Sequence, residues 1–208
     1  MPTPDFDLCL VTDRTQTHGR DLLWVLERAL EGGVRAVQLR EKDLSGKALF
    51  QLADKAGELC ERHHARLFIN DRIDVALAID ATGVQLGKTS IPITTARALV
   101  GPRKLIGFSA HSLEEAQLAQ RSGADFVVFG PVYFTPSKAQ YGKPQGLEAL
   151  KKIVENVTLP VYAIGGIKAE SIADMRRIGV RGVALISAIL SAGEPKGAAA
   201  SIVELLQR

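Results

Sequence analysis

Residues 36–43 could carry chemistry, because they begin as an apolar run and end in a burst of charge. Gln38, Arg40 and Lys42 lie in the charged half of this stretch. Cations and amide groups bind anions well, so a strand that ends in these side chains would do more than pack. If other strands end in the same way, we expect all of these ends to meet at one site.

Polar or glycine residues follow the other apolar runs as well. They are Thr12-Asp13, Asn70-Asp71, Gln85 and Gly87, Ser109 and His111, the stretch 130–138, Gly165-Gly166 and Ile186-Ser187. Contact with water alone would explain one polar strand end. Two basic residues within three positions and a glycine pair instead favour a binding site.

Eight apolar runs alternate with eight segments of helical spacing. The expected strands are 8–11, 34–40, 66–69, 82–86, 104–108, 125–129, 160–164 and 182–186, and the expected helices are 21–31, 45–63, 73–79, 94–100, 112–121, 147–157, 171–178 and 194–207. Continuous apolar strands are typical of a parallel sheet covered by helices. We predict a single (β/α)8 barrel domain over residues 1–208, with an open doubly wound sheet as the alternative. All eight strand–helix units are short, which favours the closed barrel over the open sheet.

The composition is that of an ordinary globular protein. Of 208 residues, 46% are hydrophobic and 24% are charged, and the net charge of +3 indicates neither a nucleic-acid partner nor a membrane surface. Cys9 and Cys60 lie in apolar runs without metal-ligand spacing, so we interpret them as reduced core residues of a cytoplasmic protein. No signal segment or membrane span is predicted. The sequence leaves the oligomeric state open, including a homodimer.

One phosphate site is predicted after the seventh and eighth strands, where barrels of this kind commonly bind phosphate. Gly165 and Gly166 follow strand seven, and Ile186 and Ser187 follow strand eight. Glycine lets backbone N–H groups approach phosphate oxygens closely, and a helix N-terminus adds a favourable dipole.

A second anion site would use Arg40, Lys42 and Lys138, with hydroxyl groups from Thr135 and Ser137. Three cations near one ligand suggest more negative charge than a single phosphate carries. A diphosphate therefore fits this site.

Asp71, assisted by Asn70, could hold Mg²⁺ against that diphosphate, since Mg²⁺ takes one or two carboxylates with phosphate oxygens and water. The alternative is that these two residues only cap the following helix.

Taken in order, the motifs resemble the thiamine phosphate synthase/TenI family over residues 10–190. The matching stretches are 10–13, 37–43, 69–76, 83–87, 129–138, 163–167 and 186–189. The resemblance implies a (β/α)8 barrel in thiamine biosynthesis that binds phosphorylated heterocycles. It implies a synthase that joins hydroxymethylpyrimidine diphosphate to thiazole phosphate and releases diphosphate.

The resemblance also assigns roles to residues. It places Gln38, Arg40, Lys42, Asn70 and Ser109 at the pyrimidine diphosphate, Asp71 at Mg²⁺, Thr135, Ser137 and Lys138 between the two ligands, and Gly165, Gly166, Ile186 and Ser187 at the thiazole phosphate. Arg40, Lys138 and His111 are the candidate catalytic residues.

Two positions depart from the synthase pattern. Ser90 stands where the synthases carry a second Mg²⁺-binding aspartate, and Gln85 replaces a histidine. These changes resemble the TenI branch, which implies a thiazole tautomerase that needs no metal and uses His111 as its proton shuttle. The cation set favours the synthase, because a tautomerase has no evident use for it. A barrel that binds thiazole phosphate without catalysis is the third alternative.

Overall fold

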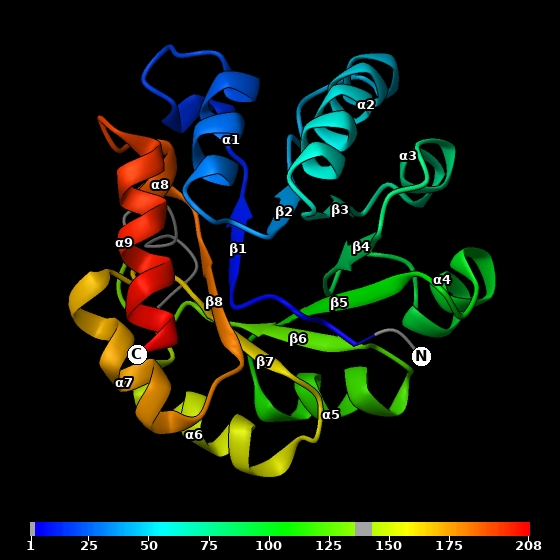
Figure 1. Ribbon diagram of the computed structural model, residues 1–208. Helices are drawn as coiled ribbons and strands as arrows, with labels where there is room; N and C mark the ends of the chain where they lie inside the picture. Colours follow the sequence, from blue (N-terminus) through cyan, green and yellow to red (C-terminus); the bar gives the residue numbers. More distant parts are fainter. Residues whose placement is uncertain (1–2, 136–142) are drawn as a thin grey trace.

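The computed structural model describes residues 3–135 and 143–208, and its strands close into a barrel (Figure 1). Each strand pairs in parallel with the next along the chain, and the last pairs with the first. The prediction of a (β/α)8 barrel is confirmed, and the open-sheet alternative is wrong. The strands are β1 Leu8–Val11, β2 Ala36–Leu39, β3 Arg66–Asn70, β4 Gly83–Leu86, β5 Leu105–Ala110, β6 Phe126–Phe129, β7 Val161–Ile164 and β8 Gly182–Leu185.

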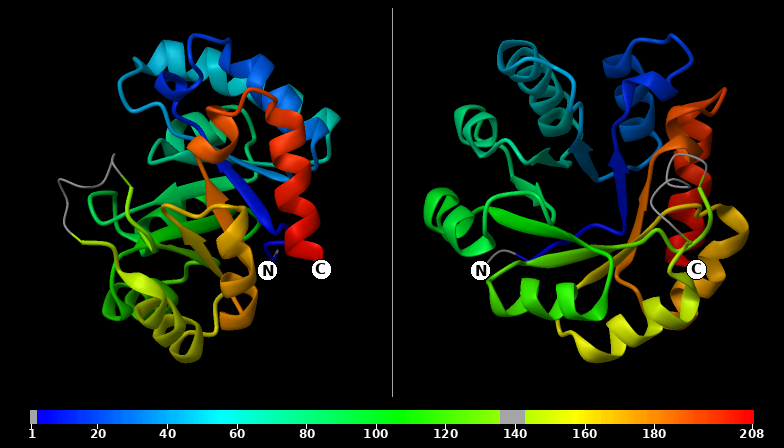
Figure 2. Two further views of the ribbon diagram at one scale, coloured as in Figure 1. Left: turned by 90° about the vertical axis from the view of Figure 1, so that its left-hand side faces the viewer. Right: turned by 180° about the vertical axis from the view of Figure 1, so that it is seen from behind.

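Helices surround the strands on the outside of the barrel (Figures 1 and 2). They are η1 Arg14–Gln16, α1 Leu22–Glu31, α2 Gly46–Arg62, α3 Ile73–Ala78, α4 Ile93–Val100, α5 Leu113–Arg121, α6 Gly146–Asn156, η3 Ala169–Ser171, α7 Ile172–Ile178, α8 Ser187–Leu190 and α9 Pro195–Gln207. The last helix, α9 (red), packs beside α1 (blue) and completes the outer ring. No helix within the described ranges is both long and apolar enough to span a membrane.

The sequence did not predict the short helices η1, η3 and α8, because three or four residues are too few for a helical period to be recognised. Four strands also end at other residues than predicted: β3 extends by one residue to Asn70, β8 ends one residue earlier at Leu185, and the ends of β2 and β5 differ as well. β2 ends at Leu39, which leaves Arg40 in the following loop, and β5 continues to Ala110, which brings Ser109 into the strand.

The barrel interior is apolar at its amino-terminal end. Phe6 closes this end and stacks on Tyr162 with 4.7 Å between ring centroids, while Phe68 and Phe126 pack around the pair. The Tyr162 hydroxyl donates a hydrogen bond of 2.8 Å to the Phe6 carbonyl, which satisfies both buried groups. Aromatic side chains thus fill the amino-terminal end of the interior, and the polar side chains lie at its carboxyl end.

Both cysteines are buried free thiols, as the sequence predicted. Burial raises the pKa of Cys9 and of Cys60 to about 12, so neither forms a thiolate near neutral pH. Their role is to fill the core.

Candidate active site

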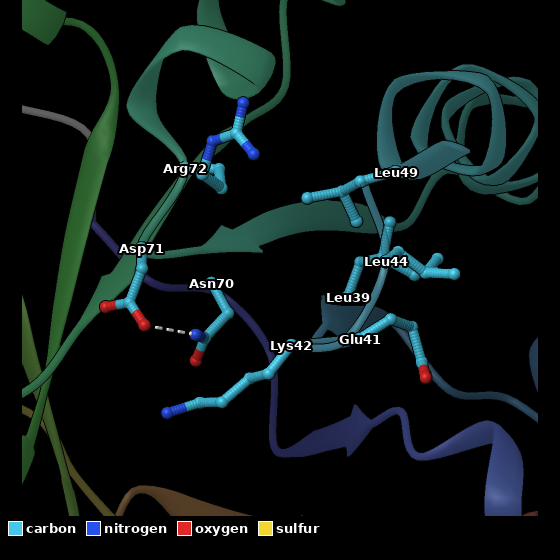
Figure 3. Close-up of a pocket in the computed structure, with 8 residues that line it drawn as sticks. All are labelled: Leu39, Glu41, Lys42, Leu44, Leu49, Asn70, Asp71 and Arg72. Carbon is cyan, nitrogen blue, oxygen red and sulfur yellow. Dashed lines mark hydrogen bonds between the residues drawn. The ribbon is translucent and has the colours of Figure 1, made fainter. Parts of the chain in front are cut away.

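A row of hydrogen-bonded polar side chains lies across the carboxyl ends of β2, β3 and β4. Gln38 Nε2 donates to Asn70 Oδ1 at 2.9 Å. Asn70 Nδ2 in turn donates to Asp71 Oδ2 at 2.7 Å, and Figure 3 shows this second bond. The Ser90 hydroxyl donates to the other oxygen of Asp71 and accepts a hydrogen bond of 2.7 Å from the Gly87 N–H. The barrel therefore brings together four side chains from three separate stretches of the sequence.

Asp71 occupies an unusual backbone conformation, with φ at +60°. Its side chain does not cap the next helix, because Arg72 is the N-cap residue of α3 and no side chain caps that helix. The cap interpretation of Asp71 is therefore wrong. Left-handed residues other than glycine are uncommon and gather at functional sites, where the surrounding contacts hold them in place. Here Asn70 and Ser90 supply those contacts.

A pocket of about 220 Å³ opens beside this row. It is lined by Leu39, Glu41, Lys42, Leu44, Leu49, Asn70, Asp71 and Arg72. In Figure 3, the exposed Lys42 side chain extends toward the side on which Asn70 and Asp71 lie. The pocket thus presents an ammonium group and a carboxylate to the same space.

Arg40 lies at the mouth next to β1. Its backbone N–H donates to the Thr12 hydroxyl at 2.9 Å, and Thr12 itself is fully buried. Burial raises the pKa of nearby Asp13, but hydrogen bonds from Thr15 and Gln16 and the positive charge of Arg40 together hold it below its usual value. The Arg40 charge therefore acts at the carboxyl end of β1.

The donor set around Asp71 fits a shared magnesium ion. Within residues 3–135 and 143–208 there is no cluster of three or more His, Cys, Asp or Glu side chains that could hold a metal by itself. Asp71 offers one carboxylate whose oxygens each keep a lone pair beyond the hydrogen bonds from Asn70 and Ser90. One carboxylate suffices for Mg²⁺ when substrate phosphates and water complete its coordination.

Gln85 makes its contacts inside the barrel. It is 2% exposed, and its Nε2 donates to the Ser109 hydroxyl at 2.9 Å. A Cβ atom at Gly107 would lie 2.1 Å from the Gln85 side-chain oxygen, so this glycine makes room for the glutamine. Gln85 and Ser109 form the second half of the polar layer at the carboxyl end.

His111 follows β5 and contacts the loop after β6. Its Nδ1 lies 2.5 Å from the Gly130 carbonyl, which can only accept, so Nδ1 carries the proton. The His111 backbone N–H donates to Glu115 at the start of α5, at 2.8 Å. The ring therefore joins two neighbouring strand ends and leaves Nε2 as the acceptor in the neutral form.

The glycine pair after β7 supports the loop that follows β6. Gly165 and Gly166 have φ values of +97° and +66°, and the Tyr133 N–H donates to the Gly165 carbonyl at 2.9 Å. A Cβ atom at Gly166 would lie 2.7 Å from both the Phe134 carbonyl oxygen and the Tyr133 Cβ. The pair thus lets the loop approach its backbone, a use that the sequence did not reveal.

The same loop carries Thr135, whose hydroxyl is buried and has no hydrogen-bond partner among the described residues. Its predicted neighbours Ser137 and Lys138 lie outside the described residues, so their placement remains a prediction. A buried hydroxyl of this kind can donate to a bound ligand.

After β8, the chain enters α8 directly. Ile186 is the N-cap residue, Ser187 begins the helix, and β8 neighbours the strand that ends at the glycine pair. At the other end of α8, the Arg20 guanidinium donates to the carbonyls of Leu190 and Ala192, each at 2.7 Å. The carboxyl-terminal end of the short helix is therefore held by Arg20 from the segment before α1.

The fold and the placement of the polar side chains indicate the class of protein. This is a (β/α)8 barrel with polar side chains gathered at the carboxyl ends of its strands, where barrel enzymes carry their active sites. Residues 8–189 match the family model described as thiamine monophosphate synthase. The chain belongs to this family.

Named relatives agree over nearly the whole length. A Geobacter sulfurreducens protein provisionally named thiamine-phosphate synthase is 50% identical, covering 99% of this chain and 97% of its own. Thiamine-phosphate synthase of Desulfitobacterium hafniense is 43% identical, covering 97% of each chain. The solved structure of thiamine phosphate pyrophosphorylase from Pyrococcus furiosus is 37% identical with a TM-score of 0.88, covering 97% of this chain and 96% of that one.

Proposed function

We propose that this protein is a thiamine phosphate synthase. It would join 4-amino-2-methyl-5-hydroxymethylpyrimidine diphosphate to thiazole phosphate. A carbon–nitrogen bond forms between the pyrimidine methylene and the thiazole ring nitrogen, and the carbon–oxygen bond to diphosphate breaks. The products are thiamine phosphate and free diphosphate, in keeping with the names of the relatives.

The observation that carries this proposal is the pocket between the ends of β2 and β3. It places Lys42 beside Asn70 and the left-handed Asp71, and Arg40 lies in the same loop, bonded through its backbone to Thr12 after β1. An ammonium and a guanidinium favour a multiply charged anion. A carboxylate among them would repel that anion unless a cation lies between the two, which supports a diphosphate bound with a metal ion.

The chemistry asks for stabilisation of a leaving group. As the carbon–oxygen bond breaks, negative charge builds on the diphosphate, and fixed cations lower the barrier by holding that charge. In this proposal Arg40 and Lys42 bind the diphosphate, and Gln38 with Asn70 orients the pyrimidine ring. The buried Thr135 hydroxyl donates to the reacting groups, together with Ser137 and Lys138.

The thiazole phosphate would bind at the glycine pair and the start of α8. Gly165 and Gly166 have no side chain that would keep phosphate oxygens from their backbone N–H groups, and Ile186 and Ser187 would contribute from the adjacent strand end. The loop packed on Gly166 leads to Thr135, so the two substrate sites would be contiguous.

Asp71 would hold Mg²⁺, with the Ser90 hydroxyl and Asn70 fixing the carboxylate. The bound metal would neutralise charge on the diphosphate. The protein would thus supply one carboxylate ligand to the metal, whereas the synthase pattern supplies two.

The tautomerase alternative rests on His111 and on the absence of a second carboxylate at position 90. The bond from His111 Nδ1 to Gly130 leaves Nε2 as the acceptor in the neutral form, which would suit a proton shuttle. Analysis of the products separates the alternatives, with mass spectrometry to detect thiamine phosphate and NMR spectroscopy to distinguish the two carboxythiazole tautomers, which have the same mass. The proposal expects thiamine phosphate from the two synthase substrates, whereas conversion of a carboxythiazole tautomer without any coupled product would contradict it. A silent barrel would convert neither substrate.

We predict that Ser90→Asp tightens Mg²⁺ binding. The new carboxylate would face Asp71, so added charge favours the cation and we expect roughly tenfold higher affinity. Without metal, the two carboxylates repel each other, and the free energy of unfolding should fall by about 1 kcal/mol. The measurement is thermal unfolding across a Mg²⁺ titration.

Ser90→Ala is the matched control, because it removes the hydrogen bond to Asp71 without adding charge. It should show no gain in Mg²⁺ affinity. Equal metal titrations for wild type and Ser90→Asp would contradict the placement of the metal at Asp71.

A further inference from the structure

The loop after β2 alternates in charge, and its negative residues are held apart from the cations. Arg40, Glu41, Lys42 and Asp43 follow one another in the sequence. The guanidinium of Arg14 in η1 binds both carboxylates, with Nη1 at 3.0 Å from Glu41 Oε2 and 2.6 Å from Asp43 Oδ1. One arginine from the neighbouring strand end therefore pairs with both acidic residues of the loop.

Glu41 is held most firmly. Only 3% of its side chain is exposed, and the backbone N–H of Arg14 also donates to both of its oxygens, each at 3.2 Å. In Figure 3, the Glu41 side chain points away from Lys42 and from Asp71. A buried carboxylate needs such partners, and the backbone and guanidinium of Arg14 supply them.

Arg40 and Lys42, the cations on either side of Glu41 in the sequence, have other neighbours than Arg14. Arg40 is fixed through its backbone to the buried Thr12, and the Lys42 side chain extends toward Asn70 and Asp71. Without Arg14, the carboxylates of Glu41 and Asp43 would be free to pair with Arg40 and Lys42, their neighbours in the chain. Such internal ion pairs would compete with an external anion for the same cations.

We infer that Arg14 is a positioning residue for the diphosphate site. It binds Glu41 and Asp43, so that neither carboxylate pairs with Arg40 or Lys42 and both cations remain available to the substrate diphosphate. The inference rests on the proposed function and goes beyond it by assigning a task to Arg14, Glu41 and Asp43, which have no predicted role as ligands of the substrate.

The test uses inorganic diphosphate with Mg²⁺ and the full-length protein in isothermal titration calorimetry. Arg14→Gln should weaken diphosphate binding about tenfold, the lower end of the losses seen when an outer-shell partner is removed. The matched control is Arg181→Gln, because Arg181 pairs with Asp7 at 2.6 Å next to the amino-terminal end of β1 and is similarly exposed. The control should bind diphosphate as the wild type does.

A rescue experiment distinguishes this effect of Arg14 on the two carboxylates from a purely structural role of Arg14. Adding Glu41→Gln and Asp43→Asn to Arg14→Gln removes the competing anions, so diphosphate affinity should return to within about twofold of wild type. A loss that persists in this triple variant would overturn the inference, as would equal binding by Arg14→Gln and wild type.

Arg14→Lys provides a second test if Arg14→Gln does not fold. A single ammonium keeps Glu41 paired but cannot bind both carboxylates, so Asp43 is released. We expect about threefold weaker diphosphate binding, restored by Asp43→Asn. Binding equal to wild type would contradict the inference. If wild type itself does not bind diphosphate, the proposed function fails, and that outcome is distinct from a failure of the role of Arg14.

Discussion

Asp71→Asn is expected to lower the rate of diphosphate release roughly 100-fold or more, the range seen when a preorganised stabilising group is lost. The change removes the negative charge that would hold Mg²⁺ and keeps the size of the side chain. Asparagine tolerates the left-handed backbone found at this position, so the fold should be retained. Steady-state assays with both substrates at saturating Mg²⁺ measure the effect.

The control for this variant is Asp80→Asn. Asp80 is also an aspartate with a left-handed backbone, φ +52°, but it follows α3 and pairs with Lys104 at 2.6 Å. Its replacement should leave the rate within about twofold of wild type, because exposed ion pairs contribute little. If Asp71→Asn were as active as Asp80→Asn, Asp71 would have no place in the mechanism.

Gly166→Ala should raise the KM for thiazole phosphate at least about tenfold. The new methyl group would lie 2.7 Å from the Phe134 carbonyl oxygen and from the Tyr133 Cβ, so the loop that leads to Thr135 must move. The φ of +66° adds strain of about 1 kcal/mol or more for any residue with a Cβ. Kinetics with each substrate varied in turn would show the effect, and the KM for the pyrimidine diphosphate should change less.

Gly179→Ala isolates the backbone strain. Gly179 also has a positive φ, +87°, but a Cβ there would make only an ordinary contact of 3.8 Å with Val154. This control should lose stability without a change in either KM. Equal KM values for Gly166→Ala and wild type would show that neither the glycine nor the loop packed on it positions the thiazole phosphate.

The barrel could be predicted because each of its units repeats the same local signals. An apolar run, a polar end and a segment of helical spacing recur along the chain, as in the helix that ends at Glu31 before two glycines. The strand ends were less certain. Ser109 is polar and reads as the start of a loop, yet in the barrel its hydroxyl accepts from the buried Gln85. A polar residue can remain in a strand when the interior offers a partner.

The partners within the site could not be read from spacing. Ser90 was interpreted only as a missing metal ligand, whereas its hydroxyl joins Gly87 to Asp71 across 19 residues. Arg14 begins the short helix η1, which the sequence did not predict, and nothing near it in the sequence indicates a partner 27 residues away. Such contacts depend on which strand ends become neighbours in the closed barrel and on the left-handed turn at Asp71.

The most direct test of the proposed function is diphosphate release by the wild-type protein with each substrate supplied alone and then together, in Mg²⁺. We predict release that requires both the pyrimidine diphosphate and thiazole phosphate, with one thiamine phosphate formed per diphosphate. No release above background with both substrates present, or release that does not depend on thiazole phosphate, would contradict it.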